Sequence, residues 1–335
     1  MEFLFEYGLF LLKAVTVVVA IGAVIILAIS ASKGESKSAG LKVEKLNDKY
    51  REMANTLRQK VLSKSEWREA EKQQKKDLKK AAKEAGDERQ KRYYVLHFKG
   101  DIRATGVESL REEVSAVVSV ADKDDEVVLC LENAGGAVQD HGLAASQLQR
   151  IKDHDIPLTV IVDKVAASGG YLMGALADRF ICAPFAIVGS IGVLMQLPNF
   201  YRFLENRGID FEQITAGKYK RTLTMFGKNS EEDREKTREE LEEVHELFKK
   251  AVSDSRPQLD IDNVATGEHW YGTRALELGL VDQLGSSDDY LMKAAQDADI
   301  YAIAYKGHEG LVSRLQGAMS AVLESAGLSQ RAPLG

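Results

Sequence analysis

Short apolar runs alternate with longer amphipathic segments from Tyr93 onward, and this alternation constrains the fold more than any other feature. The runs are typical of strands, and the segments between them, about 10–18 residues long, are typical of helices. Strands separated by helices form parallel βαβ units, so the sequence predicts an α/β fold. The predicted strands are Tyr93–Phe98, Glu126–Leu131, Pro157–Val162, Phe180–Ala183 and Ile300–Tyr305, and the predicted helices are Gly106–Ala121, Gly135–Asp153, Ser168–Leu176 and Glu231–Ser253.

The first 32 residues are strongly apolar. The run Gly8–Ala31 carries one charge, Lys13. A helix of this length spans a bilayer core of about 30 Å. A cleaved signal peptide is the alternative, but it needs a basic leader and an apolar region of only about 7–15 residues. Because the leader here is acidic, we expect an uncleaved membrane anchor over residues 1–32.

Residues 33–92 are basic, with 19 Lys and Arg against 11 Asp and Glu. Apolar residues at helical spacing predict an amphipathic helix, and the segment is interpreted as a juxtamembrane helical spacer. These residues are Leu41, Leu46, Tyr50, Met53, Leu57 and Val61. The stretch Lys72–Arg92 fits a solvated helix or linker, or a surface for anionic lipid headgroups. No nucleic-acid partner is expected, because aromatic residues are not interleaved and residues 93–335 are acidic.

Residues 180–201 contain no charged side chain, so hydropathy alone would mark a second membrane helix. The segment also contains Pro184, Gly189, Gly192 and Pro198. Because parallel strands read as continuous apolar runs, we expect a buried strand-and-loop region inside one α/β domain over 93–305. A tail over 306–335 follows, with a helix predicted at Leu311–Leu323.

Two glycine-containing turns follow predicted strands, at residues 132–138 and 166–171. The carboxyl ends of parallel strands are where α/β proteins place their sites. Gly135 and Gly136 would let backbone N–H groups approach an oxygen closely. Ser168 begins the next helix and is interpreted either as an N-cap or as a nucleophile beside an oxyanion hole.

The residues alone do not identify a general base. No His lies between Ser168 and His245, while His141 and His154 are each as easily solvated. A neutral Lys can replace His, which leaves four candidates open. They are Lys164, Lys218, Lys220 and Lys228. No His pair has the spacing of metal ligands, and two Cys form no disulfide scaffold, so no metal and no cofactor are expected.

Five motifs, in order, resemble the signal peptide peptidase A family of serine proteases. They are Glu-Asn-Ala-Gly-Gly (132–136), Ala-Ser-Gly-Gly-Tyr (167–171), Gly-Ser-Ile-Gly-Val (189–193), Ala-Gly-Lys-Tyr-Lys (216–220) and Gly-Leu-Val-Asp (279–282). The resemblance covers about 93–305 by motif, and the layout of anchor, basic segment and single catalytic unit resembles one branch of the family. It implies a crotonase-like (Clp protease-like) spiral of βαβ units, catalysis by residues 93–305 and a homo-oligomer.

The resemblance also implies roles for individual residues. Ser168 matches the nucleophile, Lys220 the general base and Ser190 the hydroxyl that orients the Lys amine. Gly135 matches the oxyanion-hole glycine, and the N–H of Gly169 is added by its position after Ser168. The family commonly has Asp-Ser-Pro-Gly-Gly at the oxyanion turn, so this chain keeps both glycines and lacks the Pro.

We therefore expect a membrane-anchored serine endopeptidase that uses a Ser-Lys dyad and an acyl-enzyme to cut signal peptides or other unfolded, apolar segments. The alternatives are a crotonase-type acyl-CoA enzyme and an inactive membrane scaffold. The resemblance implies a bacterial inner membrane with a periplasmic catalytic domain. Charge favours the opposite side, because residues 1–8 lack Lys and Arg while residues 32–51 have six.

Overall fold

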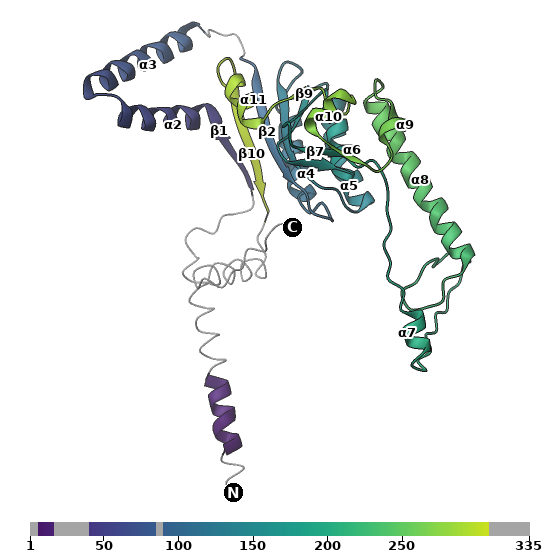
Figure 1. Ribbon diagram of the computed structural model, residues 1–335. Helices are drawn as coiled ribbons and strands as arrows, with labels where there is room; N and C mark the ends of the chain where they lie inside the picture. Colours follow the sequence, from purple (N-terminus) through teal and green to yellow (C-terminus); the bar gives the residue numbers. More distant parts are fainter. Residues whose placement is uncertain (1–5, 17–39, 85–89, 308–335) are drawn as a thin grey trace. The chain divides into compact units, whose positions relative to one another are not determined.

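The computed structural model describes residues 6–16, 40–84 and 90–307 (Figure 1). The chain divides into two compact units, one made of Met1–Lys42 with Tyr305–Gly335 and the other of Val43–Ala304. In the first unit, residues 6–16 are helical. The second unit holds every residue that the motifs single out.

A seven-stranded sheet forms the centre of the second unit. Its strand order is β1-β10-β2-β3-β4-β6-β9, and the five pairings from β10 to β9 are parallel. The strands are β1 (Gly40–Lys45), β2 (Arg92–Lys99), β3 (Glu126–Glu132), β4 (Leu158–Val162), β6 (Arg179–Cys182), β9 (Gln283–Leu284) and β10 (Asp299–Lys306). The predicted α/β fold with parallel strands is confirmed.

Helices cover both faces of this sheet, because successive strand residues point to opposite sides. Leu96, Leu129 and Val160 face α4 (Val107–Val118), α5 (Val138–Asp153) and α6 (Gly169–Ala175) in the larger core. Val95, Val128 and Ile161 face α2 (Leu46–Val61) and α11 (Ser287–Ala294) in the smaller core. The apolar strands are therefore buried on both faces, as expected for parallel strands.

A second, three-stranded sheet positions the glycine turns. It contains β5 (Val165–Ala167), β7 (Ile187–Gly189) and β8 (His269–Tyr271), with β5 parallel and β8 antiparallel to β7. A single bridge from Asn133 to Ala166 joins the end of β3 to β5. The two turns are thereby held next to each other.

A long arm, residues 193–230, follows β7 and includes α7 (Tyr201–Glu205). It folds back on itself, since Asn199 Nδ2 donates to Thr224 O at 2.8 Å and to Gly227 O at 3.0 Å. It leads into α8 (Glu231–Ser255), which begins with a capping box between Ser230 and Asp233 and packs on α6. The remaining described helices are α3 (Lys64–Glu84), α9 (Ile261–Val264) and α10 (Gly272–Glu277).

Two sequence predictions need correction. Leu41 is not part of an amphipathic helix, because residues 40–45 form β1 and the helix begins at Leu46. Asn47 fixes this start, donating to Ala298 O at 2.8 Å and accepting from the Ile300 N–H at 2.8 Å. The helix predicted from Gly135 begins at Val138, because Gly135 adopts φ 89°, outside the helical region.

The uncharged segment 180–201 is buried only in its first half. Residues 180–182 lie in β6 and residues 187–189 in β7, but Leu194 is 75% exposed and begins the exposed arm. The described parts of the chain contain no helix long and apolar enough to cross a membrane. Most of the run Gly8–Ala31 and the predicted helix Leu311–Leu323 lie outside the described residues.

Candidate active site

Ser168 lies in a sharp turn between β5 and α6. Its backbone has φ 52° and ψ −121°, a left-handed φ that a non-glycine residue rarely adopts. The Ser168 N–H donates to Gly189 O at 2.8 Å, which fixes the turn. The side chain makes no capping bond although Ser168 is the N-cap residue of α6. The capping interpretation therefore does not describe this hydroxyl, for which no partner is found among the described residues. A strained backbone of this kind is typical of functional sites.

Gly135 lies directly against this turn. A β-carbon at Gly135 would be 2.6 Å from the Ser168 β-carbon and 3.0 Å from the Gly169 nitrogen. With φ 89°, the position also disfavours any L side chain. The structure thus brings together Ser168, Gly135 and Gly169, the three residues expected to form the nucleophile and the oxyanion hole.

The two N–H groups expected to form the oxyanion hole differ in whether they already donate a hydrogen bond. Gly169 is the first residue of α6, so its N–H has no acceptor within the helix, and no other described residue accepts a hydrogen bond from it. The Gly135 N–H donates to Asn133 Oδ1 at 2.9 Å. One donor is therefore open and the other is already engaged by a neighbouring side chain.

Ser190 is adjacent to the Ser168 turn. It follows Gly189, whose carbonyl accepts the Ser168 N–H, and its own N–H donates to Glu268 O at 2.6 Å. Its φ is 54°, so the half-buried hydroxyl also projects from a left-handed backbone. Across residues 40–84 and 90–307, no hydrogen bond of this hydroxyl is recorded.

Lys220 lies on the exposed arm and is not brought to Ser168 within one chain. The segment that carries it packs at the start of α8, where Lys218 pairs with Glu232 at 2.5 Å and Lys236 lies over the Tyr219 ring. Figure 1 shows this segment beside the N-terminal end of α8, away from α6. No contact of the Lys220 ammonium with another described residue is recorded, and its side chain is exposed.

The four candidate lysines separate into two groups. Lys164 pairs with Glu132 at 3.1 Å, and Lys218 pairs with Glu232. The bond to Glu232 also raises the pKa of Lys218, which opposes a neutral amine. Lys220 and Lys228 form no ion pair within the described ranges.

Two buried residues beneath the turn were not identified as site residues from the sequence. Asn133 and His141 are each 1% exposed. His141 Nε2 lies 3.2 Å from Asn133 Oδ1, and a β-carbon at Gly169 would be 2.4 Å from His141 Cγ. His154 is exposed, in contrast. Their adjacency depends on β3 and α5 packing around β5, which spacing alone does not reveal.

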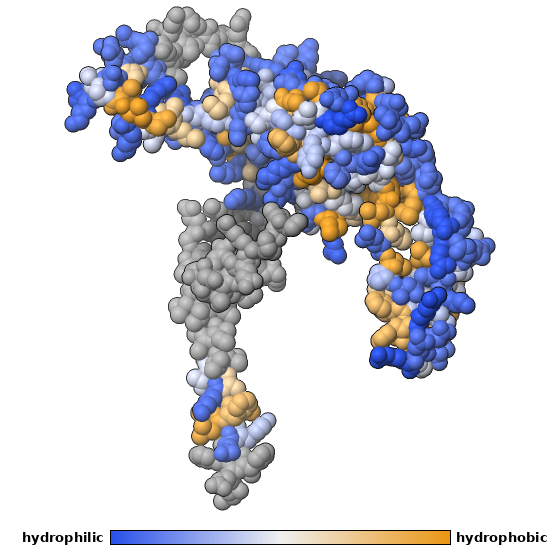
Figure 2. Space-filling model, viewed as in Figure 1, coloured by the Kyte–Doolittle hydropathy of each residue, from blue (hydrophilic) through white to orange (hydrophobic). Residues whose placement is uncertain are grey.

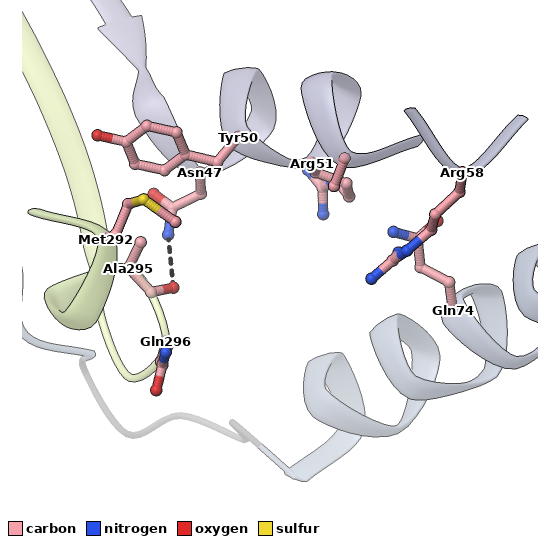
Figure 3. Close-up of a pocket in the computed structure, with 9 residues that line it drawn as sticks. Asn47, Tyr50, Arg51, Arg58, Gln74, Met292, Ala295 and Gln296 are labelled. Carbon is pink, nitrogen blue, oxygen red and sulfur yellow. Dashed lines mark hydrogen bonds between the residues drawn. The ribbon is translucent and has the colours of Figure 1, made fainter. Parts of the chain in front are cut away.

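A separate hollow of about 410 Å³ lies between α2, α3 and α11 (Figure 3). Asn47, Tyr50, Arg51, Arg58, Gln74 and Met292 line it, and Asn47 donates across it to Ala295 O at 3.2 Å. None of the candidate catalytic residues lines this hollow. No group of three or more His, Cys, Asp or Glu suited to a metal ion is found among the residues described.

Two protein-family models match consecutive parts of the sequence. "Peptidase family S49 N-terminal" matches residues 2–148 and "Peptidase family S49" matches residues 150–301. The "Probable protease SohB" of Haemophilus influenzae is 43% identical over 324 residues, covering 93% of this chain and 92% of the relative. The "Probable protease SohB" of Buchnera aphidicola subsp. Acyrthosiphon pisum is 52% identical over 224 residues, covering 67% of each.

Among solved structures, the ClpP protease catalytic domain from Plasmodium falciparum is similar with a TM-score of 0.38 and 9% sequence identity. The match covers 58% of this chain and 85% of that one.

Proposed function

The chain belongs to peptidase family S49, and from this premise we propose that it is a serine endopeptidase with Ser168 as nucleophile and Lys220 as general base. The family resemblance read from the five motifs is confirmed by the SohB relatives. One observation carries the proposal: Ser168 is held on a left-handed backbone, with its side chain directly against Gly135. Membership of a peptidase family also argues against the acyl-CoA and inactive-scaffold alternatives.

The proposed reaction proceeds through an acyl-enzyme. Ser168 Oγ attacks the peptide carbonyl while its proton moves to the neutral amine of Lys220. The negative oxygen is bound by the N–H groups of Gly169 and Gly135, each worth about 3–4 kcal/mol in comparable sites. Protonated Lys220 then gives its proton to the leaving amine. Water hydrolyses the ester with the same Lys as base, and Ser190 orients the Lys amine.

The base must reach the nucleophile from another copy of the chain or by movement of the arm. A homo-oligomer meets this need, because Lys220 lies on the exposed arm between β7 and α8 and forms no ion pair with a described residue. Figure 2 shows apolar side chains gathered on this arm. They include Leu194, Phe200, Phe203, Phe211 and Ile214, of which Ile214 is 94% exposed. Several exposed apolar side chains gathered on one segment mark an interaction surface.

The same apolar surface suits an extended, apolar peptide, which supports unfolded chains or signal peptides as substrates. The proposal also includes the division of the chain. Residues 1–32 are a membrane anchor, and residues 33–92 are a spacer. Residues 93–305 form the catalytic part with a Clp-like spiral fold, and residues 306–335 form a tail. Placement in a bacterial inner membrane with the catalytic part in the periplasm belongs to it as well. A reporter fused after residue 40 tests that side, and a cytoplasmic signal would reverse it.

Peptidase assays on the purified full-length chain in detergent test the function. Ser168→Ala and Lys220→Ala should each lower kcat for an apolar peptide by a factor of about 10³ or more. Ser146→Ala and Lys228→Ala are matched controls, because both side chains are exposed and outside the proposed dyad. Wild-type rates in Lys220→Ala would overturn the dyad, and turnover of a CoA thioester in place of peptide would favour the acyl-CoA alternative.

A further inference from the structure

Asn133 is built into the floor of the proposed oxyanion hole. Its N–H donates to Val165 O at 2.9 Å, and its carbonyl accepts the Ala167 N–H at 3.0 Å. Both bonds run to β5, the strand that ends directly before Ser168. The backbone of Asn133 is therefore fixed relative to the nucleophile, and so is the Cα atom that carries its side chain.

The Asn133 side chain is equally confined. Its Oδ1 accepts the Gly135 N–H at 2.9 Å, and its Nδ2 lies 3.5 Å from Met173 Sδ. A β-carbon at Gly100 would be 2.4 Å from Asn133 Cγ, so the amide is packed against that glycine. The Gly135 N–H thus points to a buried oxygen, although the proposed reaction needs this donor for the substrate oxyanion.

His141 supplies a second donor to the same oxygen. Its Nε2 lies 3.2 Å from Asn133 Oδ1, which is an acceptor, so Nε2 donates to it in the tautomer that carries the proton on Nε2. Its Nδ1 lies 2.9 Å from Ala137 O, so a neutral ring serves Asn133 in one tautomer and Ala137 in the other. When His141 serves Asn133, Oδ1 keeps a hydrogen bond even if Gly135 withdraws.

We propose that Asn133 is a latch on the oxyanion hole, holding the Gly135 N–H in the resting enzyme and releasing it to the substrate oxyanion, with His141 stabilising the released Asn133 carbonyl. This inference rests on the proposed function and assigns a regulation to the same site. Opening is not opposed by an unsatisfied buried acceptor, because Asn133 Oδ1 keeps the His141 N–H when the Gly135 N–H leaves it. Asn133 and His141 are positioning residues, since neither touches the reacting atoms.

The latch predicts opposite effects for its two members. Asn133→Ser shortens the side chain that accepts the Gly135 N–H and so frees this donor. We expect kcat to rise about 3- to 30-fold. The rise stays below the factor of about 10²–10³ in kcat that a complete oxyanion-hole donor contributes. His141→Phe removes the donor that supports opening, so kcat should fall by about tenfold while KM changes less than twofold. In the Asn133→Ser background, His141→Phe should have no further effect on kcat.

Steady-state kinetics on the full-length chain in detergent test these values, with melting temperatures recorded for each variant. A purely structural role would lower kcat in both single variants, and their effects would add; either result overturns the latch. Hydrogen exchange followed by mass spectrometry on peptides covering 133–137 provides a readout independent of catalysis. The Gly135 amide should be protected in the wild type and exchange at least tenfold faster in Asn133→Ser.

Failure of the latch and failure of the proposed function give different results. If the chain is not a serine peptidase, wild-type protein will cleave no peptide, while exchange at Gly135 still reports on the Asn133 bond. If only the latch is wrong, wild-type activity will depend on Ser168, and Asn133→Ser will leave exchange at Gly135 unchanged.

Discussion

The Cα hydrogen of Gly135 points at the side chain of Ser168, and a β-carbon in its place would lie 2.6 Å from the Ser168 β-carbon. Gly135→Ala should therefore abolish peptidase activity, because the new methyl group would displace the Ser168 turn or the Gly135 amide. Stability should also fall, since φ at this position is 89°. Peptide-cleavage assays and thermal unfolding measure both effects.

Gly142→Ala is the matched control for that substitution. Gly142 lies within α5, and a β-carbon there would meet nothing within 4 Å. Alanine should raise stability by about 0.5–1 kcal/mol and leave kcat unchanged. Full activity in Gly135→Ala would show that Gly135 does not contribute to the oxyanion hole.

Mixing two inactive variants tests whether Lys220 acts on the Ser168 of another copy. Ser168→Ala and Lys220→Ala, combined under conditions that exchange subunits, should recover activity, because some interfaces then pair an intact Ser168 with an intact Lys220. Random exchange makes this about one quarter of the interfaces. Co-purification of two differently tagged forms checks that exchange occurred. No recovery despite exchange would place both residues of the dyad in the same chain.

The ion pair between Arg256 and Asp282 connects the end of α8 to the sheet. Arg256 Nη2 lies 2.5 Å from Asp282 Oδ1, and Asp282 Oδ2 accepts the Phe180 N–H at 2.7 Å. Arg256 is 2% exposed, so Arg256→Ala should lower the free energy of unfolding by about 2–4 kcal/mol. Denaturant unfolding of the full chain measures this change. Arg274→Ala, which removes an exposed pair with Glu277, should change it by less than about 1 kcal/mol.

Tyr290 predicts a loss of stability at alkaline pH. Burial, together with the hydrogen bond to Glu126, raises the pKa of Tyr290 from its usual 10.0 to about 12. The phenol is therefore neutral in both states below pH 10, and ionises first in the unfolded state above it. Stability should decline between about pH 10 and 12. In Tyr290→Phe the slope over this range should be shallower; an unchanged slope would assign the decline to other groups.

The sequence predicted the large sheet because its central strands are long apolar runs. Glu126–Leu131 and Pro157–Val162 match β3 and β4 to within one residue at either end. The short strands β5, β7 and β8 were missed, because three residues show no period and form only through contacts between distant segments. Leu41 was misplaced because an apolar spacing that suits a helix also occurs across β1 and the start of α2.

Part of the candidate site was likewise predicted from the sequence. The glycine turns at strand ends singled out Ser168 and Gly135, the family resemblance gave them roles, and Gly169 was added by its position after Ser168; the structure brings the three together. Asn133 and His141 were not assigned a role, because their contact depends on how α5 packs against β5. Lys220 was assigned as the base from the family resemblance, and in the structure it lies on the exposed arm with no ion pair among the described residues.

Covalent labelling of Ser168 tests the central claim most directly. The full-length protein in detergent is treated with a fluorophosphonate, digested, and the modified residue is located by mass spectrometry, with Ser168→Ala and Ser146→Ala treated in parallel. The account predicts stoichiometric modification of Ser168 in the wild type and in Ser146→Ala, and none in Ser168→Ala. Modification of a different residue, or peptide cleavage that persists in Ser168→Ala, would contradict it.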